Sequence, residues 1–527
     1  MSGVVGGYAV GRLGRDVMRR KLERLLAQSV DEGMIALVSA IAQLQAGNPA
    51  PLQFLRDFPS EAVGASLQSD YHIPLWILET IVNELLATPK KPGFGVGMSR
   101  ILRADRFASM RLLANVLIEL ENAEDGIFLA KHDVFTEMAR IAQRQFPWQR
   151  GIANGPSVYR SLYLYGSGRA ASFFESSAGI TVSDFVKVGF YLSSRLGHAS
   201  STGRFQDLSS IAITPDQREA ALAKYALPHA AARSHAMMIR ADRRHTAYRP
   251  SILRDFPVIT FGDRNERLRA PISELITYRF TSGLHRDVVT GGAAVWTEIG
   301  SRFEQYCLDY LQAMMRPFTV IGEQNYGTKK SRYRTPDVLV MNNGVVHLVA
   351  ECKAKRMSFD ARFSDDPAAA ASLGFNEIAK GIFQIWRFFA HARTKVTDIV
   401  EVHSDCQGIL ITADSWLTMA RNQEAHVYRA AHAMADQEGG IEPQDRRDIA
   451  FCVIDDIEFV LQNGSAEAFL TACRGVCSGE KKGWILSVAH AVSQGAARPY
   501  PFLDRIGEIL PWWNCEKQDY ENPSIPI

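Results

Sequence analysis

The stretch SRYRTPDVLVMNNGVVHLVAECKAKR, residues 331–356, contains the residues that decide the fold of the C-terminal half. Its centre reads VLVM, then Asn-Asn-Gly, then VVHLVAECKAK, and Asn-Gly between two β-branched runs is a strong short-range signal for a β-hairpin. Alternation along the second strand places Glu351 and Lys353 on one face and Cys352 on the other. The hairpin is therefore predicted to bring Asp337 beside Glu351 and Lys353.

The tripeptide that opens this stretch, Thr335-Pro336-Asp337, also occurs earlier as Thr214-Pro215-Asp216. The earlier copy is followed by QREAALAKYAL, which has helical spacing and no strand. A threonine cap, a proline in the first turn and an aspartate at the positive end of the dipole are typical of a helix start. Only the second copy is predicted to carry chemistry.

The charged residues of the predicted second strand indicate a function. Charged side chains in an otherwise apolar strand are unfavourable unless they have partners or a role. Two carboxylates brought together repel, which favours a divalent cation between them. A neighbouring lysine can then position or deprotonate a water molecule activated by that cation. This combination suits hydrolysis of a phosphodiester.

The order Pro-Asp, hairpin, Glu-x-Lys resembles the PD-(D/E)XK nuclease superfamily, whose core runs helix, three strands, helix, strand. The chain has a candidate for each element, and the candidates outside the hairpin are AVWTEIGSRFEQYCLDYLQAM (294–314), FTVIGEQNY (318–326), ASLGFNEIAKGIFQIWRFFAHA (371–392) and QGILITADSW (407–416). A further apolar run at 448–461 is predicted to add an edge strand. The resemblance covers about residues 295–415. It implies an α+β multidomain chain, in which a mostly α-helical N-terminal half precedes an α/β restriction-endonuclease-like domain with a central mixed sheet.

The resemblance implies a role for each residue of the hairpin. Asp337 and Glu351 would ligate Mg²⁺ or Mn²⁺ together with the backbone carbonyl of Cys352. Lys353 would orient the attacking water or stabilise charge on the phosphorane.

Two residues outside the hairpin complete the implied site. Glu304, on the apolar-faced helix before the sheet, would join the metal shell, with Glu298 as the alternative. Gln384 would place the nucleophile or the substrate. The related branch of the superfamily has a tyrosine four residues after this glutamine, where the chain has Phe388.

Basic residues gather on both sides of the second strand. The candidates for binding nucleic acid are Lys329, Lys330, Arg332, Arg334, Lys355 and Arg356. They would hold the phosphate backbone, and the alternative is an ordinary solvated loop. A second cluster lies in residues 231–254 and consists of Arg233, Arg240, Arg243, Arg244, Arg249 and Arg254. For this cluster, phosphate contacts on one hand and a solvated face or interdomain ion pairs on the other are about equally compatible with the sequence.

The rest of the chain is predicted to be mostly helical. Apolar residues recur at three- and four-residue steps through residues 15–145, interrupted by Gly- and Pro-rich breakers. The predicted domains are a helical domain at 1–150, a helical or linker region with an Arg-rich end at 151–250, a PD-(D/E)XK nuclease-like domain at 251–470 and a helical extension at 471–527.

Composition restricts the remaining possibilities. The 527 residues have a net charge of +2, so a nucleic-acid surface must be a local patch. Seven scattered cysteines predict no disulfide framework, and Cys473 and Cys477 are expected to pack on a helix face. The N-terminus lacks the pattern of a secretory signal, and the most apolar window, residues 34–44, is short of the roughly 20 residues that a membrane helix needs. We expect a cytoplasmic protein with no membrane contact.

The sequence thus predicts a Mg²⁺-dependent endo- or exonuclease that acts on nucleic acid, with DNA favoured. By analogy, a large helical half on this fold suggests bacterial defence against phages or mobile elements, and that half is the candidate surface for a second copy or a partner protein. One alternative is a catalytically silent, nuclease-like nucleic-acid-binding or scaffold subunit, which should lack one of the site residues. Another is an RNase, in which Tyr326, Tyr333 and Trp386 would stack on bases.

Overall fold

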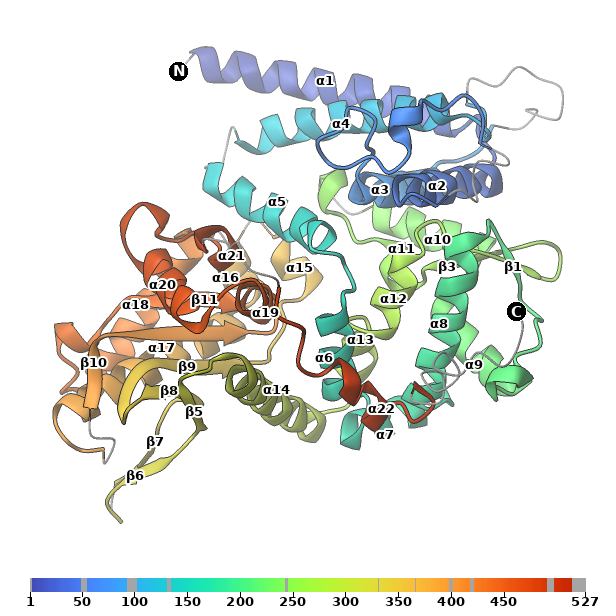
Figure 1. The fold of residues 1–527 in the computed structure, drawn as a ribbon. Helices are drawn as coiled ribbons and strands as arrows, with labels where there is room; N and C mark the ends of the chain where they lie inside the picture. Colours follow the sequence, from blue (N-terminus) through green and yellow to red (C-terminus); the bar gives the residue numbers. More distant parts are fainter. Residues whose placement is uncertain are drawn as a thin grey trace. The chain divides into compact units, whose positions relative to one another are not determined.

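The computed structural model describes residues 2–48, 55–91, 102–129, 134–241, 245–329, 331–364, 366–397, 401–417, 421–490 and 497–513 (Figure 1). The chain forms two compact units. The first contains residues 1–137, 144–154 and 171–290, and the second contains residues 138–143, 155–170 and 291–527. Helices dominate, with a four-stranded and a five-stranded sheet, so the predicted α+β class is confirmed.

Long helices form most of the first unit. The helices that lie in it wholly or in part are α1 Ser2–Leu26, α2 Asp31–Gln45, α3 Leu75–Ala87, α4 Phe107–Leu129, α5 Val134–Gln149, α7 Gly168–Ala178, α8 Val182–His198, α9 Pro215–Tyr225, α10 His229–Arg240, α11 Ile252–Asp255, α12 Glu274–Phe280 and α13 Leu284–Val288. Short 3-10 helices lie at Ser60–Ala62, Ser209–Ile211 and Thr246–Tyr248. The apolar stripes of α1 to α4 meet in one core around Leu26, Ile41, Leu78 and Leu117, all of which are buried.

A small sheet in the first unit was not predicted from the sequence. Its strands are β1 Thr202–Gly203, β2 Ala226–Pro228, β3 Val258–Phe261 and β4 Arg267–Arg269, in the order β1-β4-β3-β2. β2 pairs with β3 in parallel and β3 with β4 antiparallel, which draws residues 258–269 into the first unit. The strands have two to four residues each, too short for an alternating pattern to be visible in the sequence.

The first Thr-Pro-Asp copy begins α9, as predicted. The Thr214 hydroxyl accepts from the Gln217 backbone N–H, and the Gln217 side chain accepts from the Thr214 N–H, which completes a capping box with Pro215 in the first turn. Asp216 is therefore a capping charge at a helix start.

No single helix in the described ranges is long and apolar enough to cross a membrane. Residues 12–26 and 31–45 pass the length and composition criterion only as a pair, and that pair is bent by 106°.

The second unit combines a five-stranded sheet with helices on its faces. Its helices are α6 Gly155–Tyr165, α14 Ala293–Met314, α15 Phe359–Arg362, α16 Pro367–Ala370, α17 Ser372–Arg393, α18 Arg421–Glu438, α19 Ile454–Gln462, α20 Ala466–Cys477, α21 Leu486–Ala489 and α22 Ile506–Ile509, with 3-10 turns at Pro443–Asp445, Gly479–Lys481 and Leu503–Arg505. Its strands are β5 Thr319–Gly322, β6 Asn325–Gly327, β7 Arg332–Arg334, β8 Val338–Asn342, β9 Val345–Lys353, β10 Glu401–Thr412 and β11 Ile449–Val453.

The large sheet is mixed, in the order β11-β10-β9-β8-β5. β5, β8 and β9 are antiparallel neighbours, whereas β10 lies parallel to both β9 and β11. The element order α14, β5, β8, β9, α17, β10 follows the predicted run of helix, three strands, helix and strand. The predicted first strand, 318–326, is divided, because β6 leaves the sheet and pairs with β7 as a separate two-stranded ribbon.

Helices α14 and α17 cover opposite faces of this sheet. On α14 the Cys307 thiol lies beside the Cys352 thiol of β9. On α17 Gly381 lies against Glu351 and Lys353, the neighbours of Cys352 that point the other way. The core between α17 and the sheet includes Ile382 and Leu410, both fully buried.

Candidate functional site

The hairpin β8–β9 positions the three predicted hairpin residues. Asn343 and Gly344 both have positive φ, 50° and 81°, as a two-residue type I′ turn requires. Val338 pairs with Ala350 across the hairpin, so the next step along the strands places Asp337 opposite Glu351. The structure therefore brings together Asp337, Glu351 and Lys353.

Asp337 is fixed to the backbone of the facing strand. Its Oδ2 accepts a hydrogen bond of 2.7 Å from the Cys352 N–H. Burial raises the pKa of Asp337, although this hydrogen bond and the charge of Lys353 act in the opposite direction. Cys352 itself is buried. The role of its backbone carbonyl as a ligand of the cation remains a prediction.

Glu351 is the most buried carboxylate of the site, with 2% of its surface exposed. Its Oε1 accepts a 2.9 Å hydrogen bond from Lys353 Nζ, while its Oε2 is buried with no hydrogen-bond partner among the described residues. Burial raises the pKa of Glu351 to about 8, and the neighbouring charges of Asp337 and Glu304 add to this rise. Burial disfavours the charged form of Lys353, but the Glu351 carboxylate outweighs it and raises the pKa of the ammonium.

Helix α17 closes the site from one side through a close approach at Gly381. A Cβ at this position would lie 3.2 Å from Glu351 Cγ and 3.3 Å from Lys353 Cε. Gln384 follows one helical turn later on the same side of α17. Its Oε1 is also buried with no hydrogen-bond partner in the described part of the chain. Phe388, where the resemblance expects a tyrosine, is buried.

Glu304 lies near the same carboxylates on α14. Burial raises its pKa to about 7, and the negative charge of Asp337 contributes to that rise. Glu298, the alternative candidate, has a structural role, because its carboxylate accepts from the Arg169 backbone N–H at 2.7 Å and pairs with Arg302 at 3.1 Å. The structure therefore favours Glu304 over Glu298 as the acidic residue next to the hairpin.

The donor chemistry of this cluster fits a hard divalent cation. Carboxylate and carbonyl oxygens are the ligands of Mg²⁺ and Mn²⁺, and the buried Glu351 Oε2 is an acceptor that the described protein atoms leave unused. However, no group of three or more His, Cys, Asp and Glu side chains in the described ranges lies close enough together to hold a metal ion. Asp337, Glu351 and Glu304 therefore do not form a ready-made site with three carboxylates around a cation. The candidate side-chain ligands are reduced to Asp337 and Glu351 of the hairpin.

The predicted nucleic-acid-binding residues fall into two groups. Lys329, Arg332 and Arg334 are exposed on the β6–β7 ribbon, which projects from the second unit (Figure 1). Lys355 is exposed and Arg356 half-buried in the segment after β9. Lys330 lies outside the described residues.

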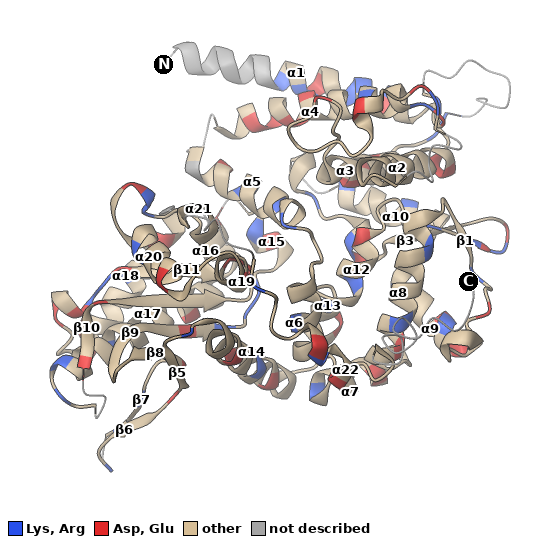
Figure 2. Ribbon diagram, viewed as in Figure 1, with Lys and Arg blue, Asp and Glu red and all other residues tan. Residues whose placement is uncertain are grey.

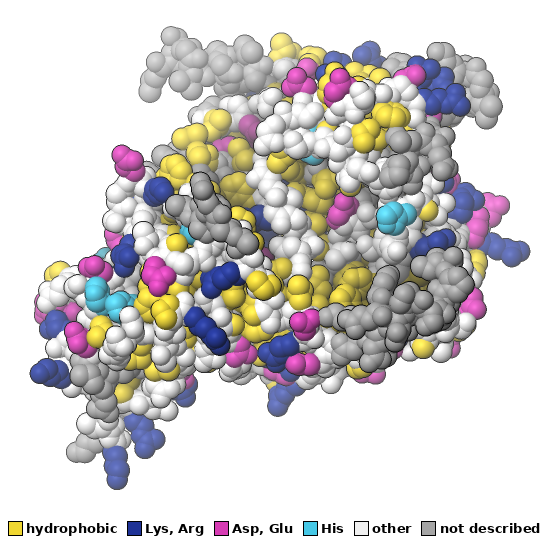
Figure 3. Space-filling view, viewed as in Figure 1, with side chains coloured by type: hydrophobic (Ala, Val, Ile, Leu, Met, Phe, Trp, Pro, Cys, Tyr) yellow, Lys and Arg dark blue, Asp and Glu magenta, His cyan; other side chains and the backbone are white. Residues whose placement is uncertain are grey.

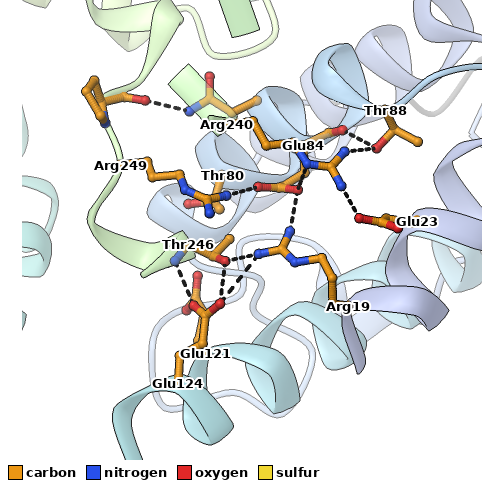
Figure 4. A network of polar contacts seen from close by, with 12 residues as sticks. Arg19, Glu23, Thr80, Glu84, Thr88, Glu121, Glu124, Arg240, Thr246 and Arg249 are labelled. Atoms are coloured by element: carbon orange, nitrogen blue, oxygen red, sulfur yellow. Dashed lines mark hydrogen bonds and ion pairs between the residues drawn. The ribbon is translucent and has the colours of Figure 1, made fainter. Parts of the chain in front are cut away.

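The other arginine-rich segment forms ion pairs within the first unit. Arg249 pairs with Glu84 at 3.1 Å, and Arg19 pairs with the same carboxylate at 2.6 Å. Arg240 bonds Glu23, and Thr246 binds Glu124 through its backbone N–H (Figure 4). The remaining described members are also paired: Arg233 with Asp31 at 2.7 Å and Arg254 with Glu79 at 2.8 Å. These four arginines form ion pairs, but within the first unit and not between domains as the sequence had suggested. Arg243 and Arg244 lie outside the described residues.

The three aromatic residues proposed for base stacking are engaged within the protein. Trp386 is 1% exposed and donates from its indole N–H to the Arg447 carbonyl at 2.8 Å. Tyr326 and Tyr333 stack on each other with centroids 5.7 Å apart, and His391 meets both rings edge-on. The base-stacking role that the RNase alternative gave to these three residues is therefore not supported.

The sequence analysis did not identify Gly381, nor did it identify Arg387 and His391, two residues of α17 that contact the tyrosines of the β6–β7 ribbon. The signal for Gly381 was present, since a glycine inside a strong helical pattern often marks a close approach of two chain segments. The cluster as a whole joins a buried carboxylate (Glu351), a half-buried carboxylate (Asp337), a lysine and a half-buried amide (Gln384), an arrangement suited to holding a cation and transferring protons. Comparison of the chain with protein-family models, with curated proteins and with solved structures gives no match in any of the three.

Proposed function

We propose that the protein is a metal-dependent nuclease that hydrolyses phosphodiester bonds in nucleic acid, preferentially DNA, on a restriction-endonuclease-like fold. The observation that carries the proposal is the buried Glu351 carboxylate, which keeps one oxygen unused beside Asp337 and Lys353. A buried carboxylate with an unpaired oxygen is unfavourable unless a ligand completes it.

The residues that would hold the cation are Asp337, Glu351 and the Cys352 carbonyl. When bound, Mg²⁺ or Mn²⁺ would supply a Lewis acid that withdraws electron density from the phosphate. The chain's own groups would do the rest. Lys353 holds its proton, so its ammonium can donate to the negative charge that develops on the phosphate oxygens.

Two further residues would handle the attacking water. Glu304, with a pKa of about 7, can accept a proton near neutral pH, as a general base must. Gln384 can orient the water or the phosphate through its buried amide. The reaction would break the phosphorus–oxygen bond in line with the attack, and the resemblance implies a 5′-phosphate and a 3′-hydroxyl as products.

The test is cleavage of supercoiled, linear and single-stranded DNA and of RNA, in Mg²⁺, Mn²⁺ or EDTA. Asp337→Asn and Lys353→Ala should each lower the cleavage rate by at least about a hundredfold. Asp216→Asn is the matched control, because Asp216 occupies the same tripeptide at a helix start and should leave the rate unchanged.

Three outcomes would contradict the proposal. Cleavage that persists in EDTA would show that the reaction needs no divalent cation. Cleavage by Asp337→Asn at the wild-type rate would show that this site does not catalyse the reaction. Inactivity on every substrate, despite cation binding, would favour the nuclease-like scaffold instead.

A further inference from the structure

The β6–β7 ribbon has one face that is fixed to the protein. Tyr326 pairs with Tyr333 across the two strands, and the rings stack 5.7 Å apart. The Tyr326 hydroxyl hydrogen-bonds His391 Nδ1 at 2.9 Å, and the Arg387 guanidinium lies 5.6 Å from the centre of the Tyr333 ring. Arg387 and His391 both belong to α17, so this helix holds the ribbon in place.

The opposite face of the ribbon is cationic. Alternation along β7 turns Arg332 and Arg334 away from Tyr333, and their cross-strand neighbours are Gly327 and Asn325. The Arg334 side chain is 69% exposed and pairs with the acidic Glu323 at 3.1 Å.

Positive charge continues to the end of the ribbon. Residues 323–334 contain four Lys and Arg and one acidic residue, a balance of 4 − 1 = +3. Lys329 is exposed in the turn between the strands. Lys and Arg residues accordingly mark the projecting end of the ribbon in Figure 2, and Figure 3 shows Lys and Arg side chains there.

This division of the ribbon indicates the kind of nucleic acid that it fits. Proteins that bind single strands offer exposed aromatic rings on which bases stack, whereas the two tyrosines here are packed against each other and against α17. A duplex hides its bases and presents phosphates, and a two-stranded ribbon fits the width of the major groove. We propose that the β6–β7 ribbon is an arm that binds duplex DNA through backbone phosphates, without reading base sequence.

The arm lies within a short reach of the carboxylate site. Arg332 precedes Asp337 by five residues, a span of at most about 17 Å in extended chain. Gly381, which contacts Glu351, and His391, which contacts the ribbon, are ten residues apart on α17, roughly 15 Å along the helix. At about 3.4 Å for each base-pair step of a duplex, Arg332 at the base of the arm lies within about five base pairs of the carboxylate site. This inference rests on the proposed function for its substrate, but binding tests it separately from cleavage.

The experiment compares full-length wild type with Arg332→Ala/Arg334→Ala by fluorescence anisotropy in EDTA, on a DNA duplex, its single strand and an RNA duplex. Removing two phosphate contacts should lower the slope of log Kd against log salt by about 1.8. Between 50 and 200 mM salt, the wild type should then lose about twelvefold more affinity for the DNA duplex than the variant. Arg316→Ala/Arg429→Ala removes two exposed arginines of the same unit elsewhere and should keep the wild-type slope. Thermal unfolding verifies that both double variants are folded.

Each result decides the proposal. A reduced slope on the DNA duplex in the ribbon variant alone supports the arm. An unchanged slope, or an equal loss in the control, overturns it. A larger ribbon effect on the single strand or on the RNA duplex overturns the assignment of duplex DNA. Since no cation is present, these results stand whether or not the protein cleaves, and failure of the nuclease proposal is detected separately by the cleavage assay.

Discussion

Gly381 of α17 lies so close to Glu351 that a Cβ on the glycine would be 3.2 Å from Glu351 Cγ. The same Cβ would be 2.7 Å from Leu410 Cδ1, in the core beneath the helix. The carboxylate site therefore depends on the absence of a side chain at one position of a helix that otherwise carries large apolar residues.

Gly381→Ala should displace the Glu351 side chain. Alanine favours a helix by about 1 kcal/mol over glycine, but overpacking a dense core typically costs about 1–3 kcal/mol. We expect a net loss of about 1 kcal/mol in the free energy of unfolding, together with weaker cation binding, measured by urea denaturation and calorimetry. Gly300→Ala is the control, because it lies inside α14 with no described atom within 4 Å of its Cβ, and it should stabilise the protein. Equal effects of the two substitutions would show that the approach at Gly381 is unimportant.

Glu351→Gln should change how stability depends on pH in the metal-free protein. Burial raises the pKa of Glu351 from its ordinary 4.5 to about 8, so between these values the folded state binds a proton that the unfolded state has lost. Stability contributed by this group must then fall as pH rises, with a slope of at most about 1.4 kcal/mol per pH unit.

The glutamine variant lacks this proton. Its free energy of unfolding relative to wild type should therefore increase between about pH 5 and about pH 8, measured by urea denaturation in EDTA. A constant difference across that range would mean that Glu351 is not protonated in the folded protein.

Cation binding should release protons. Glu351, one of the two carboxylates that would hold the cation, has a pKa of about 8, so it holds a proton in neutral and acidic solution, and a carboxylate must lose its proton before it ligates a cation. Titration calorimetry with Mn²⁺ in buffers of different ionisation enthalpy measures that release. The number of protons should fall as the pH is raised past about 8, and the affinity should rise. Binding without proton release at acidic pH would place the cation elsewhere.

Arg249→Ala should affect stability and leave nucleic-acid binding alone. Its partner Glu84 is buried but keeps two other cations, Arg19 at 2.6 Å and Arg240 at 3.9 Å, so the loss should be about 1–3 kcal/mol, less than for a fully unpaired charge. Urea denaturation measures this loss, and anisotropy should give a DNA affinity within about twofold of wild type, since the salt slope follows phosphate contacts. If Arg249→Ala lowered the slope of log Kd against log salt as much as the ribbon variant does, Arg249 would have to contact nucleic acid.

The elements that depend on neighbouring residues were predictable from the sequence. The Asn343-Gly344 turn fixes the β8–β9 register locally, and the Thr214 capping box fixes the start of α9. The strands and helices around the hairpin follow from their apolar patterns in the same way, because each pattern is complete within one segment.

Features that join distant segments were not predictable. Nothing near Arg249 in the sequence indicates that Glu84 will neutralise it, and nothing near Tyr333 indicates that His391 will cover its ring. The division of 318–326 into β5 and β6 has the same origin, because β6 follows its partner β7 away from the sheet. Gly381 lies between these cases, since its presence in a helix was visible but the atoms it approaches were not.

The hydrogen bond from the Cys352 N–H to Asp337 has a consequence for how cation and substrate would bind together. It uses one acceptor position of Oδ2, so Oδ1 is the Asp337 oxygen that is freer to bind a cation. Mg²⁺ takes six oxygen ligands and readily draws several from phosphates and water. With so few from the protein, a nucleic-acid phosphate would complete the shell, and each ligand would raise the affinity of the other by the same factor. Cation and DNA should therefore bind cooperatively. The free protein should bind the cation weakly, and the protein–DNA complex should bind it tightly.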